Sequence, residues 1–88
     1  MKLKSEITQG NIARWSEAIR ALRPQDVRQE DLPTAEYYSI NIKAAVMAGW
    51  FENGATPEMV DEMTPRAAQK LSRQVWDIYA NAYSKDPN

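Results

Sequence analysis

The chain has 88 residues, a formal net charge of −1, and neither cysteine nor histidine. Its length predicts a single domain, residues 1–88, which buries only about 60–65% of the surface exposed on unfolding and so has a thin stability margin. The missing residue types exclude disulfide bridges and the usual zinc sites, and we predict neither a metal nor a cofactor. Association with a second copy or with another protein would add stability, so we consider a homo-oligomer.

The sequence also bears on where the protein works. No segment approaches the roughly 20 apolar residues that a membrane span requires. The N-terminal stretch MKLKSEITQG has lysines but no apolar segment behind them, so we do not expect a signal peptide. We therefore expect a cytoplasmic protein that does not enter a membrane.

The charges are unevenly distributed along the chain. Residues 1–28 hold six basic and three acidic residues, residues 29–64 hold one and seven, and residues 65–88 hold four and two. Such segregation favours complementary contacts within the molecule. A nucleic-acid-binding domain of this size is usually basic overall, so the slightly acidic total argues against nucleic acid as a partner.

The first predicted element is a narrow amphipathic helix from about Thr8 to Leu22. Its apolar residues recur at intervals of three and four: Ile12, Trp15, Ile19 and Leu22. Pro24 ends this helix, because the residue before a proline is pushed away from helical dihedrals. Residues 1–7 are predicted to be an extended, flexible lead-in.

A polar connection over residues 24–33 leads to a central helix, predicted from Thr34 as the capping residue to about Phe51 and closed by Asn53-Gly54. Two apolar series share this helix: Tyr37, Ile40, Ala44, Met47 and Phe51, and beside them Tyr38, Ile42, Ala45 and Gly49. Together the series cover more than half of its circumference, whereas a surface helix needs one stripe. We therefore expect this helix to be packed on more than one side.

Two Thr-Pro steps open the remaining helices, because threonine caps a helix and proline suits its first position. Thr56-Pro57 begins a short acidic helix that reaches Met63, and Thr64-Pro65 begins a long one that reaches about Ser84. The long helix has one apolar stripe and an aromatic ridge beside it: Ala68, Leu71, Val75, Ile78 and Ala82, then Trp76, Tyr79 and Tyr83. Residues 85–88 are predicted to be a flexible tail. The fold class is all-α, a small bundle of three long helices and one short helix.

Catalysis has little support in the sequence. Four acidic residues gather near the short helix: Glu52, Glu58, Asp61 and Glu62. They lack the tight glycine-containing loop that usually brings several oxygens onto a hard cation, so we interpret them as a solvated acidic face. Serine and threonine sit mainly at capping or surface positions. We predict no catalytic residue, and we do not expect an enzyme.

DNA binding is an alternative that the last helix keeps open. Arg66, Lys70 and Arg73 share one face of it, and Thr64-Pro65 would lie in the turn of a helix-turn-helix. The preceding short helix is acidic and would repel phosphate, and the turn lacks the usual glycine. A solvated basic face is the simpler interpretation.

The aromatic residues point towards protein partners. Eight are present: Trp15, Tyr37, Tyr38, Trp50, Phe51, Trp76, Tyr79 and Tyr83. Most must belong to the core, but a bundle this small does not easily bury both aromatic ridges, and an exposed remainder is typical of a protein–protein surface. The predicted interface residues are Trp50, Phe51, Trp76, Tyr79 and Tyr83.

A family resemblance covers about 50 residues, from Tyr37 to the C-terminus. The central helix ends in the pattern A-A-x-x-A-G-W, at Ala44, Ala45, Ala48, Gly49 and Trp50. After a variable acidic stretch and a short helix, the last helix begins at a proline, has the form V-x-x-x-Y and closes in D-P-N: Pro65, Val75, Tyr79 and Asp86-Pro87-Asn88. With these features the segment resembles small tail assembly chaperones of long-tailed bacteriophages and prophages. The leading helix of the Thr8-Gln9-Gly10 type is compatible with them.

The resemblance implies a non-enzymatic, all-helical protein of the host cytoplasm that acts in phage morphogenesis. Such proteins are thought to coat the tape measure protein, to help deliver tail tube subunits, and to be absent from the finished virion. Members are often made in a second, longer frameshifted form. Alternatives remain open: an interaction module with no tail role, or the DNA-binding regulator described above.

Overall fold

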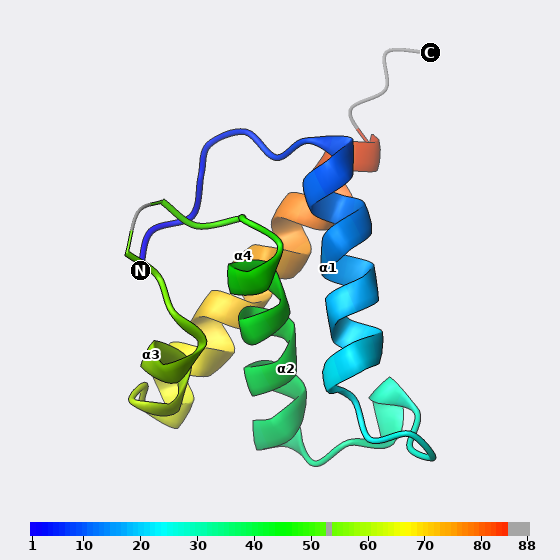
Figure 1. Cartoon of the computed structure of the whole chain (residues 1–88). Coiled ribbons are helices and arrows are strands. Elements are labelled where there is room, and N and C mark those ends of the chain that lie inside the picture. Colours follow the sequence, from blue (N-terminus) through cyan, green and yellow to red (C-terminus); the bar gives the residue numbers. More distant parts are fainter. Residues whose placement is uncertain (53, 85–88) are drawn as a thin grey trace.

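The computed structural model describes residues 1–52 and 54–84, apart from the side chains of Gln29, Tyr83 and Ser84. This part of the chain is all-α, as predicted. It forms α1 (Gln9–Leu22), a 3-10 turn (Gln29–Asp31), α2 (Thr34–Met47), α3 (Pro57–Asp61) and α4 (Pro65–Ser84) (Figure 1). The predicted flexible tail, residues 85–88, lies outside the described residues.

Helix α1 starts in a capping box, which two residues form reciprocally. The Asn11 backbone N–H donates to the Thr8 hydroxyl oxygen at 3.1 Å, and the Thr8 backbone N–H donates to the Asn11 side-chain oxygen at 3.0 Å. These bonds satisfy donors that a helix start otherwise leaves unpaired. The helix ends at Leu22, before Pro24, so both predicted ends are confirmed.

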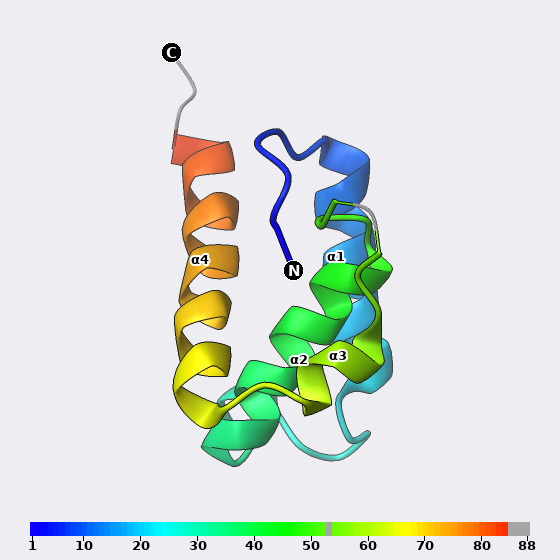
Figure 2. The ribbon, with the colours of Figure 1, turned by 90° about the vertical axis from the view of Figure 1, so that its left-hand side faces the viewer.

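Helix α2 is the centre of the fold. It packs against α1, α3 and α4, and Figures 1 and 2 show α1 beside it and α4 passing behind both. Ala44 and Ala45 are fully buried, and such small side chains let neighbouring helices approach closely. The predicted central position of this helix is therefore confirmed.

The predicted end of α2 at Phe51 is wrong, because the helix stops at Met47. Gly49 has a φ of +80°, and the chain closes there in a Schellman motif. In that motif the Gly49 N–H donates to the Val46 carbonyl at 3.2 Å, and the Trp50 N–H donates to the Ala45 carbonyl at 2.9 Å. The apolar series continued through position 49, but a glycine in a left-handed conformation ended the helix.

The segment after α2 runs extended beside the N-terminus. Leu3 and Phe51 form an isolated antiparallel β-bridge, with no strand elsewhere in the described residues. The Lys4 N–H donates to the Trp50 carbonyl at 2.9 Å, and the Glu52 N–H donates to the Lys2 carbonyl at 2.7 Å. The lead-in is thus extended, as predicted, but backbone hydrogen bonds hold residues 2–4 in place.

Two predicted helix caps differ from the structure. Thr34 is the first residue of α2, with Pro33 at the capping position, and no side chain caps that helix. The Thr56 side chain makes no capping bond at α3 either. Thr64 does cap α4, because its hydroxyl accepts the Ala67 N–H at 3.2 Å. The first backbone N–H groups of α2 therefore receive no hydrogen bond from a capping side chain among the described residues.

Candidate functional site: a groove between α2, α3 and α4

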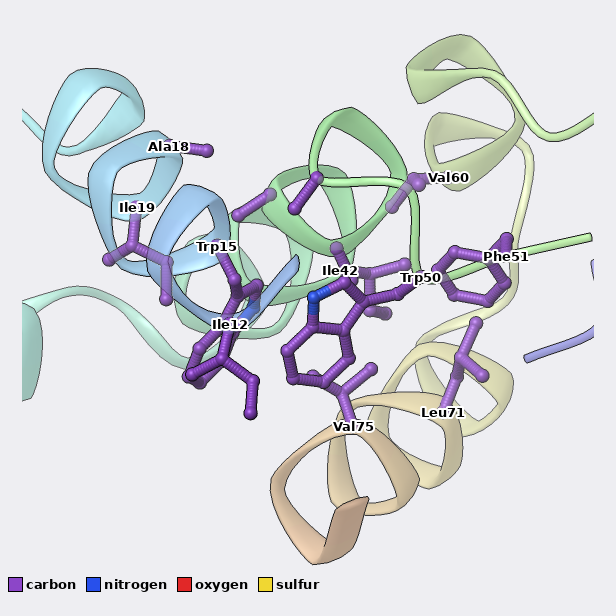
Figure 3. Close-up of a cluster of buried hydrophobic side chains, with 13 residues drawn as sticks. Ile12, Trp15, Ala18, Ile19, Ile42, Trp50, Phe51, Val60, Leu71 and Val75 are labelled. Carbon is purple, nitrogen blue, oxygen red and sulfur yellow. The ribbon is translucent and has the colours of Figure 1, made fainter. Parts of the chain in front are cut away.

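Two of the predicted interface residues, Trp50 and Phe51, lie in the core. Trp50 is fully buried and Phe51 is 6% exposed. Figure 3 shows side chains from α1, α2 and α4 converging around the Trp50 ring, which lies 5.0 Å from that of Trp15. The Trp50 indole N–H donates to the Asn11 carbonyl at 2.8 Å. This burial argues against the expectation that the pair faces a partner.

Trp76 and Tyr79 form the edge of the same aromatic cluster. Their rings lie 5.0 and 5.2 Å from the ring of Trp15, and 5.7 Å from each other. Both residues are half-buried against the core. The fifth predicted interface residue is Tyr83, whose side chain lies outside the described part. The described aromatic ridge therefore holds α4 against α1.

Some buried polar groups in this cluster have hydrogen-bond partners and others do not. The indole N–H of Trp15 donates to the Asn41 carbonyl at 3.1 Å, as that of Trp50 does to Asn11. Among the described residues, the indole nitrogen of Trp76 and the hydroxyl of Ser72 are buried and have no hydrogen-bond partner. A buried polar group left unpaired costs about 1–3 kcal/mol, so α4 carries a local penalty on its inner face.

An apolar groove of about 600 Å³ opens where α2, α3 and α4 meet, and we call it the α2–α4 groove. Figure 1 shows α3 and the first turns of α4 beside α2. Its lining comes from three elements: Thr34, Ala35, Tyr38 and Ser39 of α2; Val60, Asp61 and Met63 in and after α3; and Pro65, Arg66, Ala68 and Gln69 of α4. Its volume falls in the range of roughly 300–1,000 Å³ that is usual for ligand pockets.

The charges of the groove do not cancel. The Asp61 carboxylate is paired with the ammonium of Lys43 at 2.9 Å. Arg66 is exposed and has no ion pair within the described residues. Both α2 and α4 begin at this groove, and a helix start carries a partial positive charge. Arg66 is therefore the charged lining residue that is left without an ion pair among the described residues.

A second hollow, of about 330 Å³, lies on the other side of the α4 start and shares Met63 with the groove. Its other lining residues are Met1, Met59, Ala67, Lys70, Leu71 and Gln74. Met1 is 41% exposed and Met59 is 39% exposed. Methionine is flexible and polarisable, and it is frequent on surfaces that accept varied partners.

The basic residues of the DNA-binding alternative are all exposed on α4. The structure divides them: Arg66 lines the α2–α4 groove, whereas Lys70 lines the second hollow. Among the acidic residues near α3, Asp61 pairs with Lys43, and Glu52 lies 4.0 Å from Lys2. Within residues 1–52 and 54–84, no group of three or more His, Cys, Asp or Glu side chains is arranged to hold a metal ion.

Of the residues that line the groove, only Arg66 was predicted from the sequence as a candidate binding residue, and that prediction was for DNA. Tyr38 was recognised only as part of a second apolar series on the central helix, and Met63 only as a contact of the short helix. The available signal was the width of the apolar surface of α2, which is more than α1 and α4 cover. The uncovered part lies near the start of α2, at Tyr38, whereas we predicted it at the C-terminal end of the helix.

Comparisons with protein-family models, with curated proteins and with solved structures find no match to this chain. Among the described residues, no helix has the length and apolar character needed to cross a membrane.

Proposed function

We propose that this protein is a non-enzymatic protein-binding module. The observation that carries the proposal is the α2–α4 groove, an apolar surface at the junction of three helices. Tyr38 and Met63 contribute to it, and aromatic residues and methionine are enriched where proteins bind one another. The exposed methionines of the neighbouring hollow extend the apolar surface around α3.

In its more specific form, the proposal is a cytoplasmic phage or prophage tail assembly chaperone that acts on tape measure and tail tube proteins. Its support is the sequence resemblance from Tyr37 onward, together with the all-α fold of the described residues. The Gly49-Trp50 part of the pattern has a structural reason, since Gly49 closes α2 and Trp50 fills the core. These two residues therefore support a fold shared with the tail assembly chaperones. For partner binding we propose the α2–α4 groove instead.

The test is co-expression with the tape measure and tail tube proteins of the same genome, followed by size-exclusion chromatography. The proposal expects a stable complex with one of them, or a tail protein that stays soluble only when this chain is present. A large coiled-coil gene directly downstream would support the tail role. If neither tail protein forms a complex or gains solubility, the chaperone role is wrong, and an interaction module without a tail role becomes the better description.

The DNA-binding alternative rests on the exposure of Arg66, Lys70 and Arg73 along α4. A salt titration with duplex DNA separates it from the protein-binding role. Micromolar or tighter affinity that falls steeply with salt would favour the regulator, because phosphate contacts release counterions. The acidic residues of α3 lead us to expect no such binding.

A further inference from the structure

We propose that the α2–α4 groove binds an apolar peptide segment that carries a carboxylate, with the carboxylate placed at Arg66. This inference rests on the proposed protein-binding function and adds the chemistry of the partner.

The apolar part of the segment follows from the floor of the groove. Tyr38, Val60 and Met63 line it together with Ala68, and these four residues come from α2, α3, the turn after it, and α4. Val60 belongs to the core, whereas Tyr38 and Met63 are half-buried. Partly exposed apolar side chains gain most when a partner covers them.

The carboxylate follows from the two charged residues in the lining. Asp61 is already neutralised by Lys43 at 2.9 Å, so it has little left to offer a cationic partner. Arg66 has no ion pair in the described part of the chain, and a guanidinium binds a carboxylate through two parallel hydrogen bonds.

The acidic character of residues 29–64 does not reverse this assignment. Glu58 lies within α3 and Glu62 follows it directly, but neither lines the groove. Glu36 lines a neighbouring hollow instead. Arg66 belongs to the lining itself and has no ion pair within the described residues.

The experiment uses two fluorescein-labelled model peptides with capped ends. Both have leucines at helical spacing; the flanking positions are glutamate in one and lysine in the other. Fluorescence polarisation gives the Kd of each peptide for the full chain. We expect the glutamate peptide to bind more tightly, and its affinity to fall with added salt.

Two pairs of variants place the peptide. Arg66→Glu should weaken the glutamate peptide at least about tenfold, whereas Lys70→Glu, one turn further along α4, should change it by less than about threefold. Gln69→Trp fills the groove and should abolish binding, whereas Gln74→Trp lies in the second hollow and should not. All four positions are exposed, and a thermal melt of each variant checks that it is folded.

Several results would overturn the inference: tighter binding of the lysine peptide, no binding of either peptide, an unchanged Kd in Arg66→Glu, or a block by Gln74→Trp in place of Gln69→Trp. These failures differ from failure of the proposed function. If a tail protein forms a complex that Gln69→Trp leaves intact, the function stands and the groove assignment fails. If the glutamate peptide binds as expected but no tail protein does, the groove stands and the chaperone role fails.

Discussion

The two ends of α2 are built in opposite ways. At the C-terminal end, Gly49 closes the helix, the Asn11 side chain donates to the Ala48 carbonyl at 2.8 Å, and Trp50 is fully buried. At the N-terminal end, within the part of the chain that the structure describes, no side chain caps the helix and Arg66 lines an apolar groove without an ion pair. Buried groups with hydrogen-bond partners stabilise a fold, whereas exposed groups without an internal hydrogen bond or ion pair can bind a partner. We therefore assign a structural role to the C-terminal end of α2 and a binding role to its N-terminal end.

The largest expected effect is at the closed end. Trp50→Ala should lower the free energy of unfolding by about 3–5 kcal/mol, because it empties the centre of the core. Urea denaturation followed by circular dichroism measures this loss. A loss below about 1 kcal/mol would contradict the closed-end assignment, since it is the size expected of a surface residue.

A matched pair of milder variants isolates the hydrogen bond. Trp50→Phe keeps an aromatic ring but removes the hydrogen bond that the indole donates to the Asn11 carbonyl, whereas the Trp76 indole has no hydrogen-bond partner among the described residues. Trp50→Phe should therefore destabilise the protein more than Trp76→Phe. The reverse order would show that the hydrogen bond of Trp50 contributes little.

The second prediction concerns the glycine that ends α2. Gly49→Ala should cost about 1–2 kcal/mol, because an L-residue is strained at a φ of +80°. The new methyl group would also lie 3.3 Å from the Asn11 side-chain nitrogen. Gly54→Ala is the control, since Gly54 has a φ of +89° but nothing within 4 Å of the added carbon. Thermal unfolding should show Gly49→Ala to be the less stable variant, and equal losses would show that the Asn11 contact adds nothing.

The third prediction has the opposite sign. Ser72 is 1% exposed and its hydroxyl has no partner, so Ser72→Ala removes an unpaired polar group and improves helix propensity. We expect a gain of up to about 1 kcal/mol in denaturant unfolding. Arg73→Ala is a suitable comparison at an exposed position on the same helix. A loss of stability in Ser72→Ala would show that the hydroxyl has a native partner.

The smallest effect on stability should be at the open end of α2. Arg66→Glu and Gln69→Trp replace exposed side chains and should change the free energy of unfolding by less than about 0.5 kcal/mol. Differential scanning calorimetry of both variants beside the parent protein gives the comparison. A large loss of unfolding free energy in either variant would mean that the side chains lining the groove stabilise the fold. The N-terminal end of α2 would then have a structural role as well.

Much of the fold could be predicted from local patterns. The apolar spacing of α1, the proline at 24 and the Thr64-Pro65 step encode helix type and bounds within a few neighbouring residues, and the structure agrees with them. The end of α2 was missed because Gly49 lay within an apolar series, and the spacing alone does not reveal its positive φ.

The site could not be predicted in the same way. Trp50 and Phe51 are held by contacts between distant parts of the chain: Trp50 packs against Trp15 and donates to the Asn11 carbonyl, and Phe51 forms a β-bridge with Leu3. The α2–α4 groove needs residues from three elements, and no single stretch contains its pattern. Composition could indicate only that some aromatic surface exceeded the needs of a small core.

The most direct test of the contrast between the two ends is an NMR titration of the ¹⁵N-labelled chain with the glutamate peptide. We expect amide shifts to change at Ala35, Tyr38 and Ser39, and in Met63 and Ala68 across the groove. The amides of Ala48, Gly49 and Trp50 should stay unchanged. Shifts concentrated at these last three residues would place binding at the closed end and contradict the account.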